Sequence, residues 1–158
     1  MAAVMSAAVF LGGCAGGEKQ GIDMTLPELA EEFNLAAADT DYALGKSGEN
    51  NDGTYSLATK DETARVICVT DGDEIKEIDV NGTGYYSPGL PSFDYMMYVL
   101  MAVDKSFDET SAGDFIANLY YEASNGGDEV FTSYNGLAYT YQKQENDYWL
   151  KIKAIDNN

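Results

Sequence analysis

A two-residue turn, Asn135-Gly136, separates two stretches of alternating polar and apolar residues, 128–134 and 137–142. Asn-Gly is a strong hairpin signal because both residues readily adopt the positive φ of a type I′ turn. A two-residue turn also sets the register of the strands that it joins. The expected pairs are Tyr134 with Leu137, Thr132 with Tyr139, and Val130 with Tyr141. The sequence therefore predicts an antiparallel sheet in this part of the chain.

A third strand, 148–155, follows a short turn at 145–147 and extends this meander. Because side chains alternate between the two faces of a sheet, Leu150 and Ile152 are expected on the face that carries Tyr139. That face is predicted to be the core face. The opposite face is expected to carry Phe131, Ser133, Thr140, Gln142, Trp149, Lys151 and Lys153.

The first half of the chain predicts a second meander, in stretches rich in Val, Ile and Tyr. The expected strands are 55–59, 64–70 and 75–80. A turn at 71–73 joins the last two of them, and the polar residues 46–53 are expected to form a loop.

A helix is predicted at 26–38, ahead of this meander. Thr25 and Glu28 have the spacing of a capping box, in which each side chain accepts a backbone N–H of the other residue. Pro27 falls in the first turn, where a missing N–H breaks no hydrogen bond. Apolar residues then recur at helical spacing, so one face of this helix should pack on the core.

Two further helices are predicted between the meanders. The first, 93–103, is capped by Ser92 and is so apolar on all sides that we expect it to be buried. The second begins at Thr110 or Ser111 and ends at the glycines 126–127.

The predicted order of elements is therefore α-βββ-αα-βββ. This order favours an α+β fold with the helices packed on one face of an antiparallel sheet. It resembles the architecture of the β-lactamase inhibitor protein, in which helices pack against a curved sheet. The resemblance lies in the order of elements.

Residues 1–13 are apolar apart from Ser6 and end in Leu11-Gly12-Gly13, followed by Cys14. The run is shorter than the roughly 20 apolar residues of a membrane-spanning helix. It matches the apolar region of a signal peptide, roughly 7–15 residues long. With its final cysteine it resembles the lipobox of bacterial lipoproteins.

The lipobox resemblance implies that Cys14 carries a diacylglycerol and that residues 1–13 are removed as a signal peptide. Residues 14–23 would form a flexible tether and 24–158 one α+β domain. The expected location is the outer face of a bacterial membrane, held by the lipid. Signal peptides begin with Lys or Arg, and none precedes Cys14, so we expect the natural start to lie upstream of Met1.

The net charge of the chain is −18, from 27 acidic and 9 basic residues, and none of the charged residues lies in 1–13. Such a domain repels nucleic acid, whose recognition depends on Lys and Arg, so no nucleic-acid partner is expected. The chain has no histidine, which removes the commonest general base and metal ligand. No cofactor, metal or catalytic residue is assigned. Cys68 lies mid-strand among apolar residues and is expected to be a small buried hydrophobe.

The best candidate for a binding site is the face opposite the core, around Trp149, Phe131, Lys151 and Lys153. The aromatic side chains offer contact area and the lysines a positive patch. The alternative interpretation is an ordinary solvated sheet face with one half-buried tryptophan.

A second candidate is Tyr85-Tyr86, in a Gly- and Pro-rich loop at 81–91. The alternative is that these tyrosines pack on the helix that follows. Acidic groups at 71–74 and at Asp39 with Asp41 offer oxygen ligands for calcium, but they lack the spacing of an EF-hand and are equally explained as turn residues.

Three functional hypotheses follow. The first is a non-enzymatic, lipid-anchored module that binds a ligand or a protein. The second is an inhibitor or regulator of an extracellular enzyme, acting through the sheet face or the Tyr85-Tyr86 loop. The third is a hydrolase that uses carboxylates alone, which requires two carboxyl groups about 5–10 Å apart in a cleft.

Overall fold

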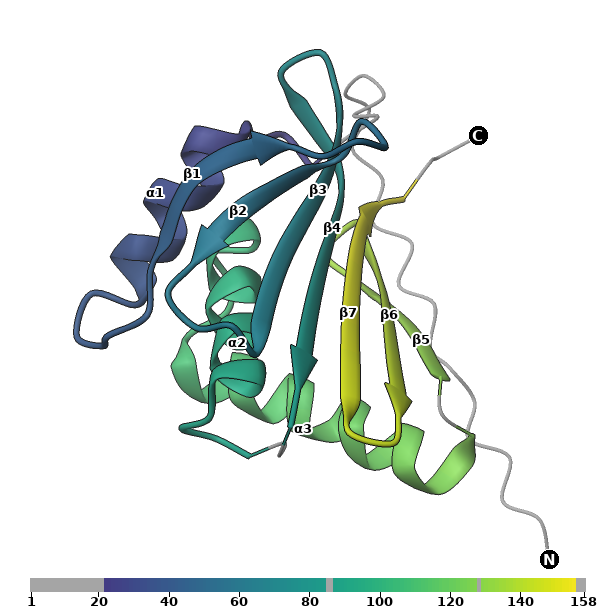
Figure 1. Ribbon diagram of the computed structural model, residues 1–158. Helices are drawn as coiled ribbons and strands as arrows, with labels where there is room; N and C mark the ends of the chain where they lie inside the picture. Colours follow the sequence, from purple (N-terminus) through teal and green to yellow (C-terminus); the bar gives the residue numbers. More distant parts are fainter. Residues whose placement is uncertain (1–21, 85–86, 128, 156–158) are drawn as a thin grey trace, which may run out of the picture.

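The computed structural model describes residues 22–84, 87–127 and 129–155 (Figure 1). Its elements are α1 (Leu26–Ala36), β1 (Leu44–Glu49), β2 (Tyr55–Thr59), β3 (Ala64–Asp71), β4 (Glu74–Thr83), α2 (Pro91–Val103), α3 (Glu109–Gly126), β5 (Glu129–Tyr134), β6 (Leu137–Gln144) and β7 (Asp147–Ala154). The predicted α+β class and the order of the helices and meanders are confirmed, with one strand added to the first meander.

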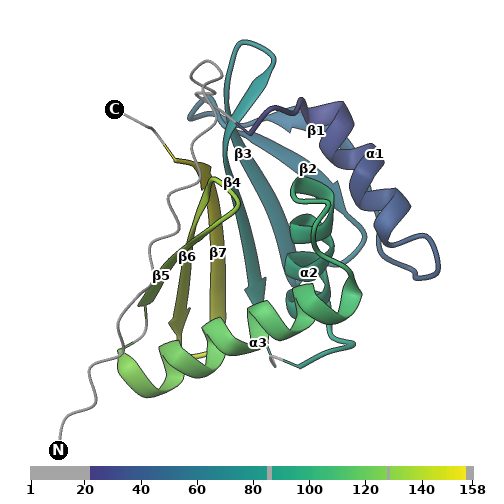
Figure 2. The same ribbon diagram turned by 180° about the vertical axis from the view of Figure 1, so that it is seen from behind.

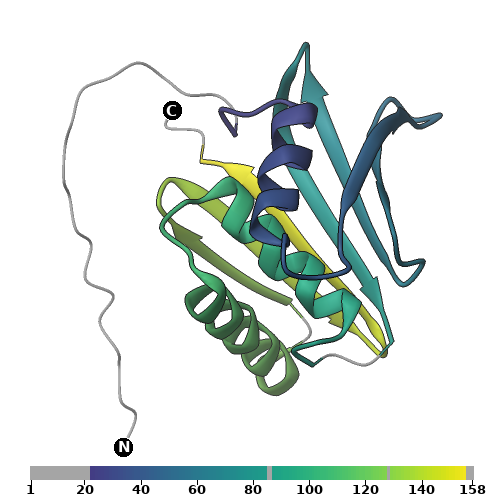
Figure 3. The same ribbon diagram turned by 90° about the vertical axis from the view of Figure 1, so that its left-hand side faces the viewer.

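The strands form a single antiparallel sheet in the order β1-β2-β3-β4-β7-β6-β5. The two meanders are joined through their last strands: β4 pairs with β7, from Glu77–Lys153 to Thr83–Asp147. Figures 2 and 3 show α1, α2 and α3 together on one face of the sheet, with α2 between the other two. No helix of the described residues covers the opposite face (Figure 2).

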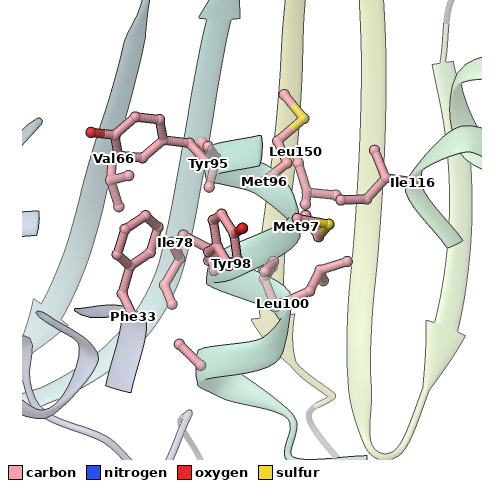
Figure 4. Packing of buried hydrophobic residues seen from close by; sticks show 14 of the residues in the cluster. Phe33, Val66, Ile78, Tyr95, Met96, Met97, Tyr98, Leu100, Ile116 and Leu150 are labelled. Carbon is pink, nitrogen blue, oxygen red and sulfur yellow. The ribbon is translucent and has the colours of Figure 1, made fainter. Parts of the chain in front are cut away.

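The helix α2 is the centre of the core. Ten of its 13 residues are buried, because α1 and α3 flank it while β3 and β4 lie beneath it. Its residues Met96, Met97 and Leu100 lie between Phe33 of α1 and Ile116 of α3 (Figure 4). The predicted buried helix is confirmed. Among the residues that the structure describes, no helix is both long and apolar enough to cross a membrane.

The structure confirms one of the predicted helix starts and corrects the other two. The predicted capping box of Thr25 and Glu28 is present. The third helix starts earlier than predicted, because Asp108 is its N-cap and Ser111 returns the hydrogen bond from three positions later. The second helix also starts earlier: Leu90 is its N-cap, and Ser92, the predicted cap, is a buried residue of the first turn.

The predicted loop at 46–53 is wrong in its first half, because β1 occupies Leu44–Glu49. Only Leu44 of this strand is buried, so its sequence has no alternation that a strand prediction could detect. The strand β4 also continues past the predicted end at 80, to Thr83. There Gly82 lies directly under α2: a Cβ added to it would be 2.3 Å from the Cβ of Ser92.

The register predicted for the second meander is confirmed pair by pair, from Tyr134–Leu137 to Val130–Tyr141. The hairpin turn has positive φ at both residues, 49° at Asn135 and 80° at Gly136, as a type I′ turn requires. The folded part also includes Ile22, which is buried and donates its N–H to the carbonyl of Ile75 at 2.8 Å. The chain therefore enters the domain at the Ile75 end of β4.

Candidate functional site: the open face of the sheet

We call the helix-free side of β3, β4, β7, β6 and β5 the open face. The strand register places residues of five strands side by side in rows across it. One row is Arg65, Asn81, Trp149, Gln142 and Glu129; the next is Ile67, Asp79, Lys151, Thr140 and Phe131. The residues predicted for this face in the second meander do lie on it, and β4 and β3 contribute the rest.

Trp149 is half-buried and lies between two hollows of the open face. We call the first, of about 460 Å³, the Phe131 hollow. It is lined by Asp79, Asn81, Glu129, Phe131, Thr140, Gln142, Trp149 and Lys151. The second, of about 360 Å³, is the Arg65 hollow, and it is lined by Glu62, Thr63, Arg65, Asn81, Gly82, Thr83, Asp147 and Trp149. The indole ring is thus a wall shared by both.

Phe131 is the most exposed aromatic side chain of the open face, at 70%. It stands on β5, the last strand of the sheet, with Thr140 beside it on β6. A phenyl ring left in water forgoes the stabilisation that burial would supply, about 2–3 kcal/mol for a large apolar side chain. A partner that covers Phe131 would recover part of this free energy.

The predicted positive patch is not present, because acidic residues of β4 neutralise both lysines. The Lys151 Nζ lies 2.9 Å from a carboxylate oxygen of Glu77 and 3.7 Å from one of Asp79. Lys153 is ion-paired with the other oxygen of Glu77. The sequence could not reveal these pairs, since they depend on the contact between β4 and β7. The roles predicted for the two lysines in binding stay predictions.

Burial raises the pKa of the Asp79 carboxyl, and the neighbouring Lys151 ammonium opposes that rise. The ion pair therefore stands in a partly desolvated place, where electrostatic interactions are stronger than in water. Glu129, at the other end of the Phe131 hollow, accepts a hydrogen bond from the Gln142 amide. Both carboxylates are thus fixed by neighbours on the adjoining strand.

Asn81 and Arg65 are two polar residues of the open face without such fixed partners. The Oδ1 atom of Asn81 is buried and accepts no hydrogen bond from the described residues. Arg65 is the only arginine of the chain, is exposed, and makes no ion pair with any residue that the structure describes. A buried acceptor without a donor is destabilising, so a ligand or a water molecule that donates to Asn81 would be favoured.

The second predicted site, Tyr85-Tyr86, lies outside the described residues. The following segment is fixed to α2, because the Gly89 amide donates to the Asp94 carboxylate at 3.0 Å. Leu90 of this segment is 36% exposed. The proposed lipidation site, Cys14, also lies outside the described residues.

The acidic group at 71–74 and Cys68 have structural roles, and Asp39 and Asp41 lie in the connection between α1 and β1. Residues 71–74 form the turn between β3 and β4, with Gly72 at a φ of 61°. Within the described ranges, no group of three or more acidic or cysteine side chains is placed to hold a metal ion. Cys68 is fully buried, and burial raises the pKa of its thiol to about 12, so it stays protonated near neutral pH. The prediction of a small buried hydrophobe is confirmed.

In the Phe131 hollow, the spacing of the strands disfavours a catalytic pair of carboxylates. Asp79 and Glu129, the two acids of the Phe131 hollow, lie on β4 and β5. These strands are three strand spacings apart, about 14 Å between backbones. A glycosidase needs its two carboxyl groups about 5–10 Å apart on either side of the bond that it breaks.

Sequence reasoning missed several residues that line these hollows, among them Asp79, Asn81, Arg65 and Glu129. Asp79, Asn81 and Arg65 reach the open face through strand β4 and its neighbour β3, and the pairing of β4 with β7 has no local signal in the sequence. The hairpin register does predict the position of Glu129, because it pairs this residue with Gln142.

Comparisons with known proteins gave no identity: no family model, no curated protein and no solved structure matches this chain. The likeness in element order to the β-lactamase inhibitor protein and the lipobox resemblance both stay predictions.

Proposed function

We propose that this protein is a lipid-anchored, extracytoplasmic binding module of a bacterial envelope that holds a protein partner on its open face. The observation that carries the proposal is Phe131, a phenyl ring 70% exposed that lines the same hollow as Trp149. Aromatic side chains are enriched at protein interfaces and often supply most of the binding free energy.

The position of the tether supports this function. Ile22, eight residues after Cys14, is hydrogen-bonded to Ile75 at the start of β4. The row that holds Trp149 crosses β4 at Asn81, six residues along the strand and therefore about 20 Å away. A lipid on Cys14 would thus connect to the domain at the end of β4 that lies away from Trp149, which leaves the Trp149 row clear of the attachment point.

Site-specific crosslinking in cells tests the binding function. A photoreactive amino acid at position 131 should capture an envelope protein, and Trp149→Ala in the same chain should reduce the yield about tenfold, as expected for an interface anchor. Leu35 of α1 is the matched control position, because it is also an exposed apolar residue, at 65%, but it belongs to the helix layer. Equal capture at both positions, or none at 131, would contradict the proposal.

The anchor is tested separately with Cys14→Ala. The wild-type protein should fractionate with membranes and its first mature peptide should carry the mass of a diacylglycerol. The variant should be found in the soluble fraction. A wild-type protein whose Cys14 thiol is unmodified would contradict the lipid anchor without affecting the binding face.

The inhibitor hypothesis allows the Tyr85-Tyr86 loop as well as the open face; in the form that uses the open face, it differs only in the partner. If the protein captured at position 131 is an enzyme and the purified domain lowers its activity, the module is an inhibitor.

A further inference from the structure

The two edges of the sheet differ in how they resist pairing with another strand. Exposed edges attract foreign strands, and proteins commonly block them with bulges, charged residues or prolines. The edge strand β1 has such protection: its register shifts between Leu44 and Ser47, and Lys46 stands within that shift. The edge strand β5, with the sequence EVFTSY, has less protection: its only charged residue is Glu129 at its first position, it contains no Lys, Pro or Gly, and it pairs with β6 over six consecutive residues without a register shift.

The hydrogen-bonding groups of β5 that face outward follow from its hairpin. Tyr134 and Leu137 flank a two-residue turn, so this pair exchanges both of its backbone hydrogen bonds. The pattern alternates along an antiparallel ladder. Thr132 and Val130 therefore bond to β6, whereas the N–H and C=O groups of Phe131 and Ser133 point away from the sheet.

The side chains on the two sides of this edge are similar in chemistry, so both would suit a strand that carries aromatic and basic residues. On the open face, Phe131 and Glu129 border the Phe131 hollow. On the helix side, a hollow of about 480 Å³ between α3 and β5 is lined by Tyr121, Glu122, Asn125, Gly126, Glu129 and Val130. Tyr121 is 70% exposed, as is Phe131. Each side of the edge thus offers one exposed aromatic ring and at least one carboxylate.

We propose that β5 is a docking edge for an extended, cationic segment of a partner protein, which adds to the sheet as an eighth strand. The backbone of that segment pairs with Phe131 and Ser133. Its side chains alternate between the two faces, where aromatic and basic residues meet the exposed rings and the carboxylates of Glu122 and Glu129. The proposal rests on the binding function proposed above and specifies how the partner is held.

Charge decides between a partner and a second copy of this chain. Each copy carries a net charge of −18, so two copies paired through β5 would repel each other. A segment rich in Lys and Arg is attracted by the same charge, and it gains opposite-charge pairs across the new strand contact.

The test uses a synthetic, fluorescently labelled peptide of about eight residues, long enough to cover β5, with alternating Phe and Thr flanked by lysines. Its binding to the whole domain is measured by fluorescence anisotropy at about 0.15 M salt, where exposed charges are partly screened. Ser133→Pro removes one outward N–H and places a ring on the docking edge, a position where sheets tolerate proline. This variant should weaken binding about tenfold or more, since strand addition depends on main-chain hydrogen bonds.

Ser47→Pro on β1 is the matched control, because Ser47 is an exposed serine whose N–H also points outward, on the opposite edge. It should leave peptide binding unchanged. Two peptides provide controls on the wild-type protein. One has N-methyl groups at alternate residues, which block strand pairing and keep the side chains, and the other has Glu in place of Lys. Neither should bind, and these results do not depend on the stability of any variant.

Equal binding of the N-methylated peptide, or equal loss in Ser47→Pro and Ser133→Pro, would overturn strand addition. Binding of the Glu peptide would overturn the cationic partner. A dimer of the wild-type protein in analytical ultracentrifugation that Ser133→Pro dissociates would make a second copy the occupant, which also overturns the proposal. If the crosslinks at position 131 persist in Ser133→Pro, the binding function stands and only the docking mode fails.

Discussion

Asp94 is the one carboxylate that the core of the described chain encloses, at 7% exposure. It lies in the first turn of α2, accepts the Gly89 amide, and stands close to the Tyr42 hydroxyl. Burial raises the pKa of Asp94, against the opposing effect of these two donors. Burial and then the charge of Asp94 raise the pKa of Tyr42 to about 12, so the phenol stays protonated at neutral pH.

The raised pKa of Asp94 predicts a pH-dependent effect of Asp94→Asn. The folded protein holds this proton more tightly than the unfolded chain, whose pKa is near 3.8, so the free energy of unfolding falls as pH rises above that value. Asparagine can still accept the Gly89 amide but has no charge. The variant should therefore gain stability relative to wild type as pH rises from 3.5 towards 7, measured by urea unfolding.

Asp108→Asn is the control, and the opposite pH dependence is expected for it. Hydrogen bonds from Ser111 lower the pKa of the Asp108 N-cap, so its contribution to stability is present above the ordinary pKa and is lost as pH falls. Asparagine is also a good N-cap. This variant should lose stability relative to wild type as pH rises. The same slope in both variants would contradict the assigned environment of Asp94.

At the scale of elements, the fold depends on how closely α2 approaches β4. A Cβ at Gly82 would be 2.3 Å from the Cβ and 2.8 Å from the Cα of Ser92. The Cα belongs to the helix backbone and cannot move alone. Gly82→Ala should therefore destabilise the domain by about 2 kcal/mol or more in urea unfolding.

Gly48→Ala is the matched control, a glycine in another strand with no atom within 4 Å of the added Cβ. It should change the free energy of unfolding by less than about 0.5 kcal/mol. If Gly82→Ala is equally mild, then α2 lies farther from β4 than the structure places it.

The hairpin of β5 and β6 is attached to the helix layer through its turn. The Asn135 side-chain amide donates to Asp104 at 3.0 Å and to Ser106 at 2.8 Å, both in the segment between α2 and α3. Asn135→Gly keeps the positive φ of the turn and removes both bonds. It should destabilise the domain by about 1 kcal/mol. In a double-mutant cycle the effect of Ser106→Ala should be smaller in the Asn135→Gly background; strictly additive effects would contradict the contact.

For the molecule as a whole, the sequence predicted the contacts between segments that are close in the chain and missed those between segments that are far apart in it. The Asn135-Gly136 turn determined the register of the second meander, and the residues on its two faces followed from alternation. The strand order did not follow, because the pairing of β4 with β7 joins segments about 70 residues apart. The sequence therefore did not predict that Asp79 and Arg65 lie on the open face, or that β5 is an edge strand.

Net charge is another property of the whole molecule. Its local effect can be measured through Trp149, because this residue is the only tryptophan and therefore the source of the tryptophan fluorescence. Its ring borders two hollows that together contain four carboxylates, Glu62, Asp79, Glu129 and Asp147, against Arg65 and Lys151. With a net charge of −18 around it, the open face should concentrate cations and exclude anions.

Collisional quenching of Trp149 fluorescence measures this field directly. Caesium and iodide quench with different intrinsic efficiencies, so each quenching constant is divided by that of free N-acetyltryptophanamide. At low ionic strength the ratio for caesium should exceed the ratio for iodide, because the cation accumulates where the anion is repelled. The difference should shrink when the salt concentration approaches about 1 M, where the Debye length falls to about 3 Å. Equal ratios at low salt would mean that Arg65 and Lys151 offset the surrounding acids, and the electrostatic attraction expected for a cationic partner would then be absent from the centre of the open face.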